Sequence, residues 1–324
     1  MFEELPFEEH RFFTGANFQT IMGSFFHFAG EPLSQTKLLT LPDGDKMSLE
    51  ITTPNGWTDS DKTVVLVHGL CGSHKSTYMI RLANHFQKVN VRTVRLNMRG
   101  CGSSSGLAKK PYHMGRSDDV LFALKYLIKE APNSSITLIG FSMGANVVLK
   151  LGGELGAQSK GLLNQIISIS PPADIIANMK KFRQPSGRFY EKFFLRSLLK
   201  EVIARKKLFP DLPDVEFPKN LTFNHFDDLY TAPLSGFDGA TDYYTKSSSK
   251  KYVPEIAVKC RILFAKDDPV VDPHLLDDLT LPKNVKLYKT EKGGHLGFFS
   301  RKKHGLHGNR WMDHILDQWI FEEA

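Results

Sequence analysis

A serine between two glycines constrains this chain more than any other feature, because it joins a strand-like stretch to a helix-like one. Residues 138–150 read LIGFSMGANVVLK, with Ser142 two places from Gly140 and two places from Gly144. At a sharp strand-to-helix turn the two backbones nearly touch, so the residues two places before and after the turn must be small. The stretch therefore predicts a tight turn that holds Ser142 exposed.

A turn of this kind supplies what a nucleophilic serine needs. A serine hydroxyl is a weak nucleophile in water, and it must be held near a base and near backbone N–H groups that stabilise an oxyanion. The helix expected to begin at Met143 also directs its N-terminal dipole at the serine. Glycines flank serines in many ordinary turns, so the motif alone allows a plain strand–helix connection. Its place between a buried strand and a helix favours a nucleophile elbow.

An elbow predicts an acid and then a histidine further along the chain. The strand expected at 261–265 is followed by two aspartates, Asp267 and Asp268, and the strand expected at 285–289 by a glycine-flanked loop that holds His295. Each of the twelve histidines could equally be a surface or structural residue. Position after the last strand favours His295 as the base.

Two considerations choose between the two aspartates. Adjacent residues that leave a strand point in opposite directions, so only one carboxylate can face the His295 loop. Pro269 restricts the backbone of Asp268 to an extended conformation. We therefore predict that Asp268 is the acid and that Asp267 caps its own turn.

The upstream sequence HGLCG at residues 68–72 follows another expected strand, TVVLV at 63–67. A loop here would place the N–H of Leu70 beside that of Met143, which predicts an oxyanion hole built from these two donors. The alternative is a plain glycine-rich turn. Arg99 and His113 are expected to brace neighbouring loops, although Arg99 could instead contact an anionic group of the substrate.

Strand-like and helix-like stretches alternate through most of the chain. The expected strands are 63–67, 91–96, 136–139, 166–169, 261–265 and 285–289, after a hairpin of 38–41 and 47–51; the expected helices are 76–88, 117–130 with Ser117 as its N-cap, 143–153 and 311–321. Such alternation is typical of the α/β class, with a mostly parallel central sheet and helices on both faces. Residues 171–253 hold helical stretches without a strand. We expect a single domain over residues 1–324, with an inserted helical cap at about 171–253.

The expected cap carries much of the chain's positive charge. Residues 174–207 contain ten Lys or Arg and three acids, a net charge of +7, which equals the formal net charge of the whole chain. Phenylalanines and leucines are interleaved with the bases. The simplest expectation is a helix with its apolar face on the domain and its basic face in solvent. The alternative is peripheral contact with an anionic membrane. No nucleic-acid-reading module is recognisable, so nucleic-acid binding is not expected.

Composition and termini bear on the compartment. Three cysteines make no disulfide framework and favour a reducing compartment. The N-terminal MFEELPFEEHRFF lacks the basic start and apolar core of a signal peptide, and no apolar run approaches the ~18 residues that span a bilayer. A soluble, cytoplasmic protein is expected. Neither metal-site nor dinucleotide motifs are present, so no metal and no cofactor are predicted.

Short stretches along almost the full chain together resemble the α/β-hydrolase superfamily, and within it the YheT-like bacterial esterases and their eukaryotic relatives. They are NFQTI (17–21), HGLCGS (68–73), NMRGCG (97–102), YHMG (112–115), GFSMGAN (140–146), FDD (226–228), SGF (235–237), DYY (242–244), DDP (267–269) and GGHLGFF (293–299). One departure is Ala16-Asn17-Phe18, where the family usually has Gly-His-Leu. The resemblance implies an α/β-hydrolase fold and a Ser-Asp-His triad of Ser142, Asp268 and His295.

The resulting prediction is a serine hydrolase that cleaves short- to medium-chain carboxylic esters or lipid esters through an acyl-enzyme. A thioesterase, a peptidase, or an acylglycerol or phospholipid lipase could use the same triad. A binding protein on an inactive hydrolase fold is the alternative from another class.

Overall fold

The computed structural model describes residues 2–25 and 30–322, and within them nine strands form one sheet. Their order across the sheet is β1 (Glu3–Glu4), β9 (Val285–Thr290), β8 (Lys259–Ala265), β7 (Gln165–Ile169), β6 (Ile136–Phe141), β4 (Thr63–Val67), β5 (Arg92–Asn97), β3 (Lys46–Thr52) and β2 (Gln35–Thr40). Only the pairs made by β3 are antiparallel. The mostly parallel sheet expected from the sequence is confirmed.

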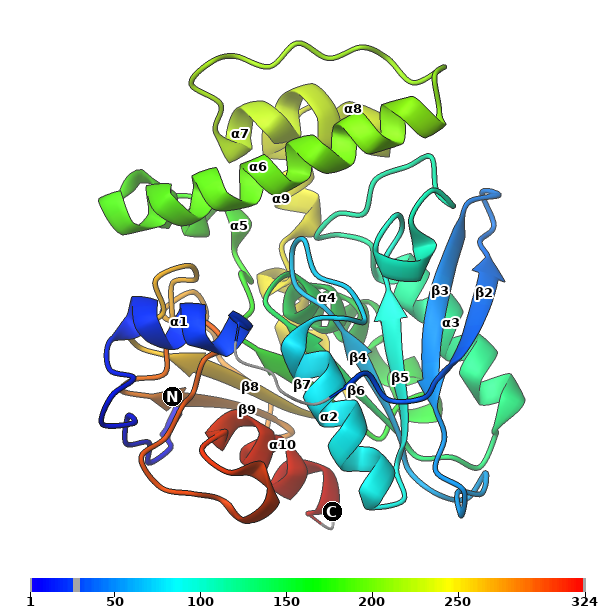
Figure 1. Cartoon of the computed structure of the whole chain (residues 1–324), viewed down its shortest axis with the longest axis vertical. Helices are drawn as coiled ribbons and strands as arrows, with labels where there is room; N and C mark the ends of the chain where they lie inside the picture. Colours follow the sequence, from blue (N-terminus) through cyan, green and yellow to red (C-terminus); the bar gives the residue numbers. More distant parts are fainter. Residues whose placement is uncertain (1, 26–29, 323–324) are drawn as a thin grey trace.

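The central strands are buried because helices cover both faces of the sheet (Figure 1). Every residue of β4 and of β7 is buried, as expected for parallel strands with long apolar runs. On one face α2 (Thr77–Lys88) and α10 (Trp311–Phe321) bury Phe86 and Leu316 in a shared cluster. On the other face α3 (Ser117–Glu130) and α4 (Met143–Leu155) pack through Val120 and Val147.

One local prediction is wrong: Ser117 is not the N-cap of α3. The helix begins at Ser117 itself, and the preceding residue, Arg116, makes no side-chain cap. The Ser117 hydroxyl instead donates to Glu154 at 2.5 Å and accepts from the Lys150 ammonium at 3.0 Å. Two partners on the neighbouring helix α4 therefore use the side chain that would otherwise cap α3.

Two N-terminal elements were not expected from the sequence. The two-residue strand β1 extends the sheet by pairing with β9. The helix α1 (Ala16–Phe25) lies beside the loop that follows β9, as its contacts with Gly294 and Gly297 show. Short 3₁₀ turns η1 (Gly102–Ser104), η2 (Gly156–Gly161) and η6 (Gly305–His307) complete the connections outside residues 171–253.

Residues 171–253, here called the helical insertion, connect β7 to the short segment before β8. They form α5 (Ile175–Asn178), η3 (Lys181–Arg183), α6 (Pro185–Leu208), α7 (Phe223–Phe226), the π-helical turn η4 (Asp227–Thr231), α8 (Ala232–Ser235), α9 (Ala240–Ser247) and most of η5 (Lys250–Glu255). In Figure 1 α6, α7 and α8 lie at the top of the view, above the body that contains the sheet. None of the helices in the described ranges is both long enough and apolar enough to cross a membrane.

The long helix α6 does not divide into an apolar buried face and a basic solvated face. Its side chains Tyr190 and Leu195 are buried as expected, but so is Arg205. Conversely, the aromatic rings of Phe189 and Phe193 are 61% and 50% exposed. The expected separation of apolar and basic residues is therefore wrong for one base, which is buried, and for two aromatic residues, which are exposed.

Candidate active site

Ser142 stands at a strained turn between β6 and α4. Its φ of 53° is positive, a conformation that costs a residue with a side chain about 1–3 kcal/mol. A Cβ added to Gly140 would come within 2.3 Å of the Gly144 carbonyl oxygen, and one added to Gly144 within 2.4 Å of the Val67 carbonyl oxygen. The two glycines thus let β6, α4 and the end of β4 approach one another at backbone distance.

The structure brings Ser142, His295 and Asp268 into one hydrogen-bonded row. The His295 Nε2 atom lies 2.8 Å from the Ser142 hydroxyl oxygen, and its Nδ1 atom lies 2.8 Å from the Asp268 carboxylate. Because an ionised carboxylate can only accept, Nδ1 carries the proton and Nε2 is free to accept one. His295 is 7% exposed and Asp268 is 1% exposed.

The Asp268 carboxylate is held by its own turn. Its second oxygen accepts hydrogen bonds from the N–H groups of Val270 and Val271, at 2.8 and 2.9 Å. These are the residues that follow Pro269, so the turn holds the carboxylate through contacts other than the one with His295. Both oxygens of a buried charge are therefore satisfied, as burial requires.

Asp267 has a role that the sequence prediction missed. Its carboxylate accepts from the N–H of Gly294, 2.9 Å away, instead of capping its own turn. Burial raises the pKa of Asp267 above its ordinary value. The two adjacent aspartates thus both contact the loop of His295, Asp268 at the imidazole and Asp267 at the backbone before it.

The helix α1 supports the His295 loop from the other side. The buried Gln19 amide donates to the Phe299 carbonyl and accepts from the Phe299 N–H, at 3.0 and 2.7 Å. The Thr20 hydroxyl accepts from the N–H of His295 at 2.8 Å. A Cβ on Gly297 would lie 2.2 Å from the Gln19 carbonyl oxygen, which shows how closely the helix packs. The NFQTI motif contains the supporting residues Gln19 and Thr20, but nothing in the motif indicated that they contact the His295 loop.

The N–H groups of Leu70 and Met143 are available beside the serine. Within the described ranges neither N–H has an acceptor. The loop that carries Leu70 is fixed on both sides, because Gly69 donates to the Tyr78 hydroxyl at 3.0 Å and Cys71 to the Tyr112 hydroxyl at 3.1 Å. Since β4 and β6 are neighbours in the sheet, this loop reaches the elbow. The free donors at this place suit an oxyanion.

Two further sequence candidates are structural. Arg99 is 2% exposed and makes a bidentate pair with Asp119, at 2.6 and 2.7 Å, while its third nitrogen binds Asp43 and Asp45. Each guanidinium nitrogen has a carboxylate acceptor, which argues against an anionic substrate group on Arg99. His113 is buried, packs edge-on against Tyr243, and burial lowers its pKa well below the usual value.

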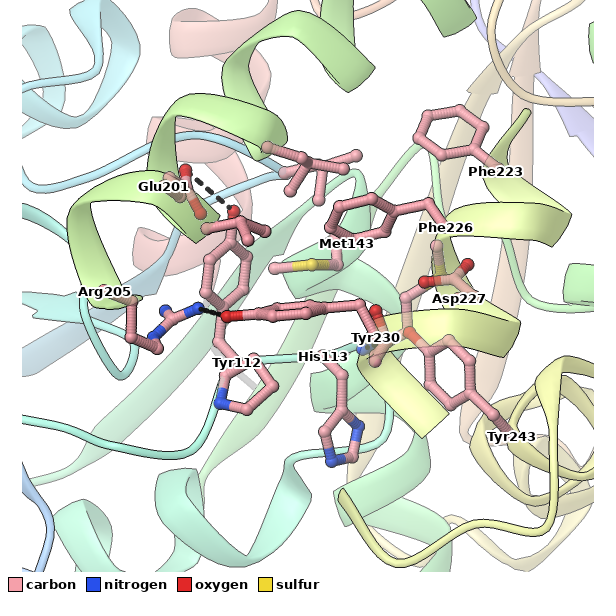
Figure 2. A pocket seen from close by; sticks show the side chains of 16 residues that line it. Tyr112, His113, Met143, Glu201, Arg205, Phe223, Phe226, Asp227, Tyr230 and Tyr243 are labelled. Atoms are coloured by element: carbon pink, nitrogen blue, oxygen red, sulfur yellow. Dashed lines mark hydrogen bonds between the residues drawn. The ribbon is translucent and has the colours of Figure 1, made fainter. Parts of the chain in front are cut away.

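A narrow cavity of about 40 Å³ lies between the elbow and the helical insertion (Figure 2). Leu70 and Met143 form part of its wall, and α6 and η4 form another part. Apolar and aromatic side chains form most of the lining, which also includes the charged residues Glu201, Arg205 and Asp227. Burial raises the pKa of Glu201 to about 7 and that of Asp227 to about 6. The cavity is thus mostly apolar, with ionisable groups in its wall.

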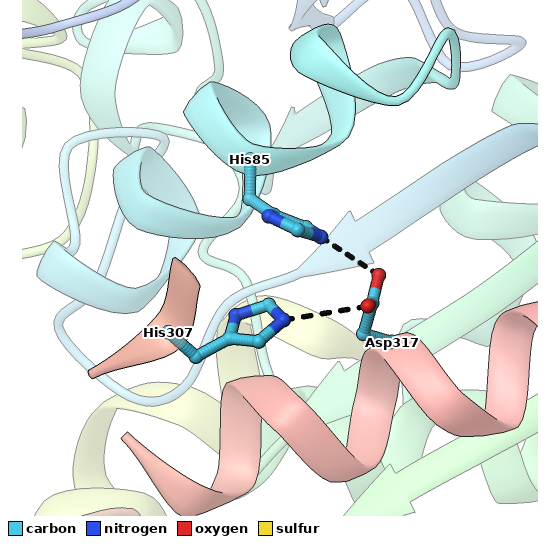
Figure 3. A group of neighbouring side chains, drawn as sticks. All are labelled: His85, His307 and Asp317. Carbon is cyan, nitrogen blue, oxygen red and sulfur yellow. Dashed lines mark hydrogen bonds and ion pairs between the residues drawn. The ribbon is translucent and has the colours of Figure 1, made fainter. Parts of the chain in front are cut away.

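One group among the described residues has the donor atoms to hold a metal, and it lies between α2 and α10 (Figure 3). The Asp317 carboxylate accepts from the imidazoles of His85 and His307, at 2.7 and 3.4 Å. Burial alone would raise the pKa of Asp317, but these hydrogen bonds lower it well below the usual range. Both imidazoles point at the carboxylate, so the cluster of these three side chains joins α2 to α10.

Comparisons with known proteins agree with the fold. A family described as having the alpha/beta hydrolase fold matches residues 62–302. The putative esterase YheT of Escherichia coli (strain K12) is 28% identical over 322 residues, which cover 96% of this chain and 91% of that protein. A monoacylglycerol lipase of Saccharomyces cerevisiae is 30% identical over 272 residues, 81% of this chain and 59% of that protein.

Among solved structures, that of Est1E from Butyrivibrio proteoclasticus with bound ferulic acid superposes with a TM-score of 0.55. Its sequence is 14% identical, and the match covers 88% of this chain and 97% of that one. At this identity the likeness concerns the fold alone.

Proposed function

The chain belongs to the α/β-hydrolase family, as a YheT-like member, and from that premise we propose that it is a serine hydrolase that cleaves carboxylic esters. Ser142 is the proposed nucleophile, His295 the base and Asp268 the acid. The observation that carries the proposal is the position of the His295 imidazole, with one ring nitrogen 2.8 Å from the Ser142 hydroxyl and the other 2.8 Å from the Asp268 carboxylate.

The proposed reaction proceeds in two stages. His295 Nε2 takes the proton of Ser142 as its oxygen attacks the ester carbonyl, and then gives it to the departing alcohol. Asp268 keeps the imidazole in the required tautomer and stabilises the imidazolium. The N–H groups of Leu70 and Met143 bind the oxyanion of each tetrahedral intermediate. Water, activated by His295, then releases the acid from the acyl-enzyme.

Labelling with a fluorophosphonate probe tests the nucleophile directly. We expect the wild-type protein to be labelled on Ser142, and we expect Ser142→Ala to abolish both labelling and hydrolysis of p-nitrophenyl esters while leaving the thermal unfolding temperature unchanged. An unlabelled wild-type protein would indicate a binding protein on a hydrolase fold. Activity of more than a few per cent in Ser142→Ala would indicate another nucleophile.

Acylglycerol hydrolysis is the more specific candidate. The yeast relative is named a monoacylglycerol lipase, and the cavity beside Leu70 and Met143 is lined mainly by apolar and aromatic side chains, which suit an acyl chain. A panel of p-nitrophenyl esters, monoacylglycerols and acyl-CoAs separates ester, acylglycerol and thioester substrates. A clear preference for acyl-CoA would favour a thioesterase instead.

We also propose that residues 171–253 act as a cap within a single domain of residues 1–324, and that α6 contacts anionic lipid. The exposed face of α6 combines two aromatic rings, Phe189 and Phe193, with the bases Arg188, Lys192 and Arg196. Aromatic and basic side chains on one helix face are the combination that binds anionic bilayers. A lipid substrate would then be met at the membrane surface.

Co-sedimentation with vesicles tests the membrane contact. We expect binding to phosphatidylserine-containing vesicles that weakens with salt, little binding to phosphatidylcholine vesicles, and loss of binding in the Phe189→Ser/Phe193→Ser double variant. The matched control replaces Leu306, which is 85% exposed in the turn η6 before α10, by serine. Equal binding to both vesicle types would leave α6 as an ordinary solvated helix.

A further inference from the structure

The cavity between the elbow and the helical insertion has in its wall an arginine that forms no ion pair with any acid of the described residues. Arg205, near the end of α6, is only 7% exposed. One of its guanidinium nitrogens donates to the Tyr230 hydroxyl at 2.9 Å, as the dashed line in Figure 2 shows. Across the part of the chain that the structure describes, no carboxylate forms an ion pair with Arg205, and its other nitrogens have no acceptor.

A buried arginine in this situation is uncommon, because buried charges are nearly always paired. Arg99 in the same protein illustrates the usual arrangement, since three aspartates bind its guanidinium. Arginine cannot lose its charge at any ordinary pH. None of the unused N–H groups of Arg205 is among the fully buried polar atoms without a partner, so the guanidinium keeps some exposed surface. Arg205 lines both this cavity and a neighbouring one that is bounded by Gly100 and Leu208.

The two carboxyl groups of the cavity do not fill this role. Glu201, one helical turn before Arg205, accepts from the Tyr112 hydroxyl at 3.4 Å instead. Asp227 accepts from the Tyr244 hydroxyl at 2.8 Å. Burial raises the pKa of Glu201 to about 7 and that of Asp227 to about 6, so both give up their negative charge near neutral pH more readily than ordinary acids. Glu201 in particular can take up a proton when another anion arrives.

The geometry points to Arg205 as the binding residue for a negatively charged group, a carboxylate or a phosphate, on the ester substrate. The planar guanidinium presents parallel N–H donors that match either group. The same cavity is bounded by Leu70 and Met143, which adjoin Ser142, so the anionic end of a substrate whose ester lies at Ser142 would be directed toward Arg205. This inference rests on the proposed ester hydrolysis and adds a substrate class to it.

Two pairs of substrates test the inference and distinguish the two anions. The first pair is a 1-acylglycerol and the same acylglycerol with a phosphate on its third carbon. The second is a series of p-nitrophenyl esters whose acyl chains end in either a carboxylate or its methyl ester. For each member kcat and KM are measured on the full-length wild-type protein, Arg205→Met and Arg205→Lys. The control is Lys219→Met, which removes an exposed cation from the same insertion.

We expect the wild-type protein to prefer the anionic member of one pair. Arg205→Met should reduce kcat/KM for that member about 10- to 100-fold, mainly through KM, because one or two charge-assisted hydrogen bonds are lost. The neutral member should change less than about threefold, Arg205→Lys should retain part of the preference, and Lys219→Met should behave as wild type. Fluorophosphonate labelling of Ser142 in each variant reports whether the site is still folded.

Two results would overturn the inference alone: a wild-type protein that hydrolyses the neutral esters but prefers neither anion, or a preference that survives Arg205→Met. If Arg205→Met does not fold, the Arg205→Lys variant decides, because an unchanged KM for the anionic substrate in that variant contradicts a bidentate contact. If the wild-type protein hydrolyses none of the esters, the proposed function itself fails.

Discussion

Replacing Glu201 by glutamine should change how the stability of the protein depends on pH. Burial raises the pKa of this carboxyl from an ordinary value of 4.5 to about 7, against the opposing effects of Arg205 and the Tyr112 hydroxyl. The folded state therefore keeps the proton to higher pH than the unfolded state. Its contribution to stability is complete below about pH 4.5 and is lost as the pH rises towards 7.

The size of the effect follows from the difference between the two pKa values. A difference of about 2.5 units corresponds to about 3 kcal/mol in total, of which roughly 2–3 kcal/mol falls between pH 5 and pH 8. Glutamine has no proton to lose. We therefore expect the free energy of unfolding of Glu201→Gln, relative to wild type, to rise by roughly 2–3 kcal/mol over that interval. Asp227 titrates in both proteins, so its contribution cancels in the comparison.

Urea unfolding of both proteins at pH 5, 6, 7 and 8 measures this difference, provided that the m-values agree. The matched control is Glu216→Gln, because Glu216 is an exposed acid of the same insertion. Its stability relative to wild type should change little over the same range. A difference for Glu201→Gln that stays constant within about 0.5 kcal/mol, or that falls with pH, would refute the argument that burial dominates at this carboxyl.

Three further outcomes are expected at the elbow and the His295 loop. Gly144→Ala should abolish fluorophosphonate labelling, because the added methyl would lie 2.4 Å from a carbonyl oxygen of β4. Labelling at the wild-type rate would show that the elbow tolerates a side chain at this position. Asp268→Asn should reduce kcat by up to ~10⁴, because it leaves the imidazole in the wrong tautomer. Asp267→Asn should reduce kcat about tenfold or less, because it only weakens the bond to Gly294. The opposite ranking of the two kcat values would exchange the roles of the two aspartates. Thr20→Val removes the acceptor of the His295 N–H and should lower kcat several-fold with KM unchanged, and a change in KM alone would mean that Thr20 acts on substrate binding.

The local signals in the sequence predicted the sheet and the turn at Ser142 well. Alternating β-branched and helical stretches determine an α/β sheet because each stretch can bury its apolar side chains in only one way. The Gly-x-Ser-x-Gly pattern predicts a close approach of strand and helix for a steric reason that needs no knowledge of distant residues. The expectation that Asp268 faces His295 came from strand geometry and from Pro269, which are also local. Its premise that only one of the two carboxylates can face the His295 loop is wrong, because Asp267 accepts from Gly294 of the same loop.

Contacts between distant segments could not be derived in this way. Gln19 and Phe299 are 280 positions apart, and nothing in either stretch indicates that a buried amide of α1 holds the loop of His295. Asp267 was expected to bond within its own turn, but one of its carboxylate oxygens accepts from a loop that follows the next strand. A short polar side chain has several possible partners, and only the packing of the chain selects among them.

Arg205 shows the same limit on a helix. In the sequence it is one of ten bases in a stretch whose cations were expected in solvent, and its spacing does not set it apart from Lys206 or Lys207. Whether a base on α6 is solvated depends on how the helix is rotated against the cavity wall and on which loops lie beneath it. The sequence by itself determined that the insertion is helical and basic, whereas the tertiary structure decided which of its charges is buried, because burial is a property of the surrounding surfaces rather than of the residue.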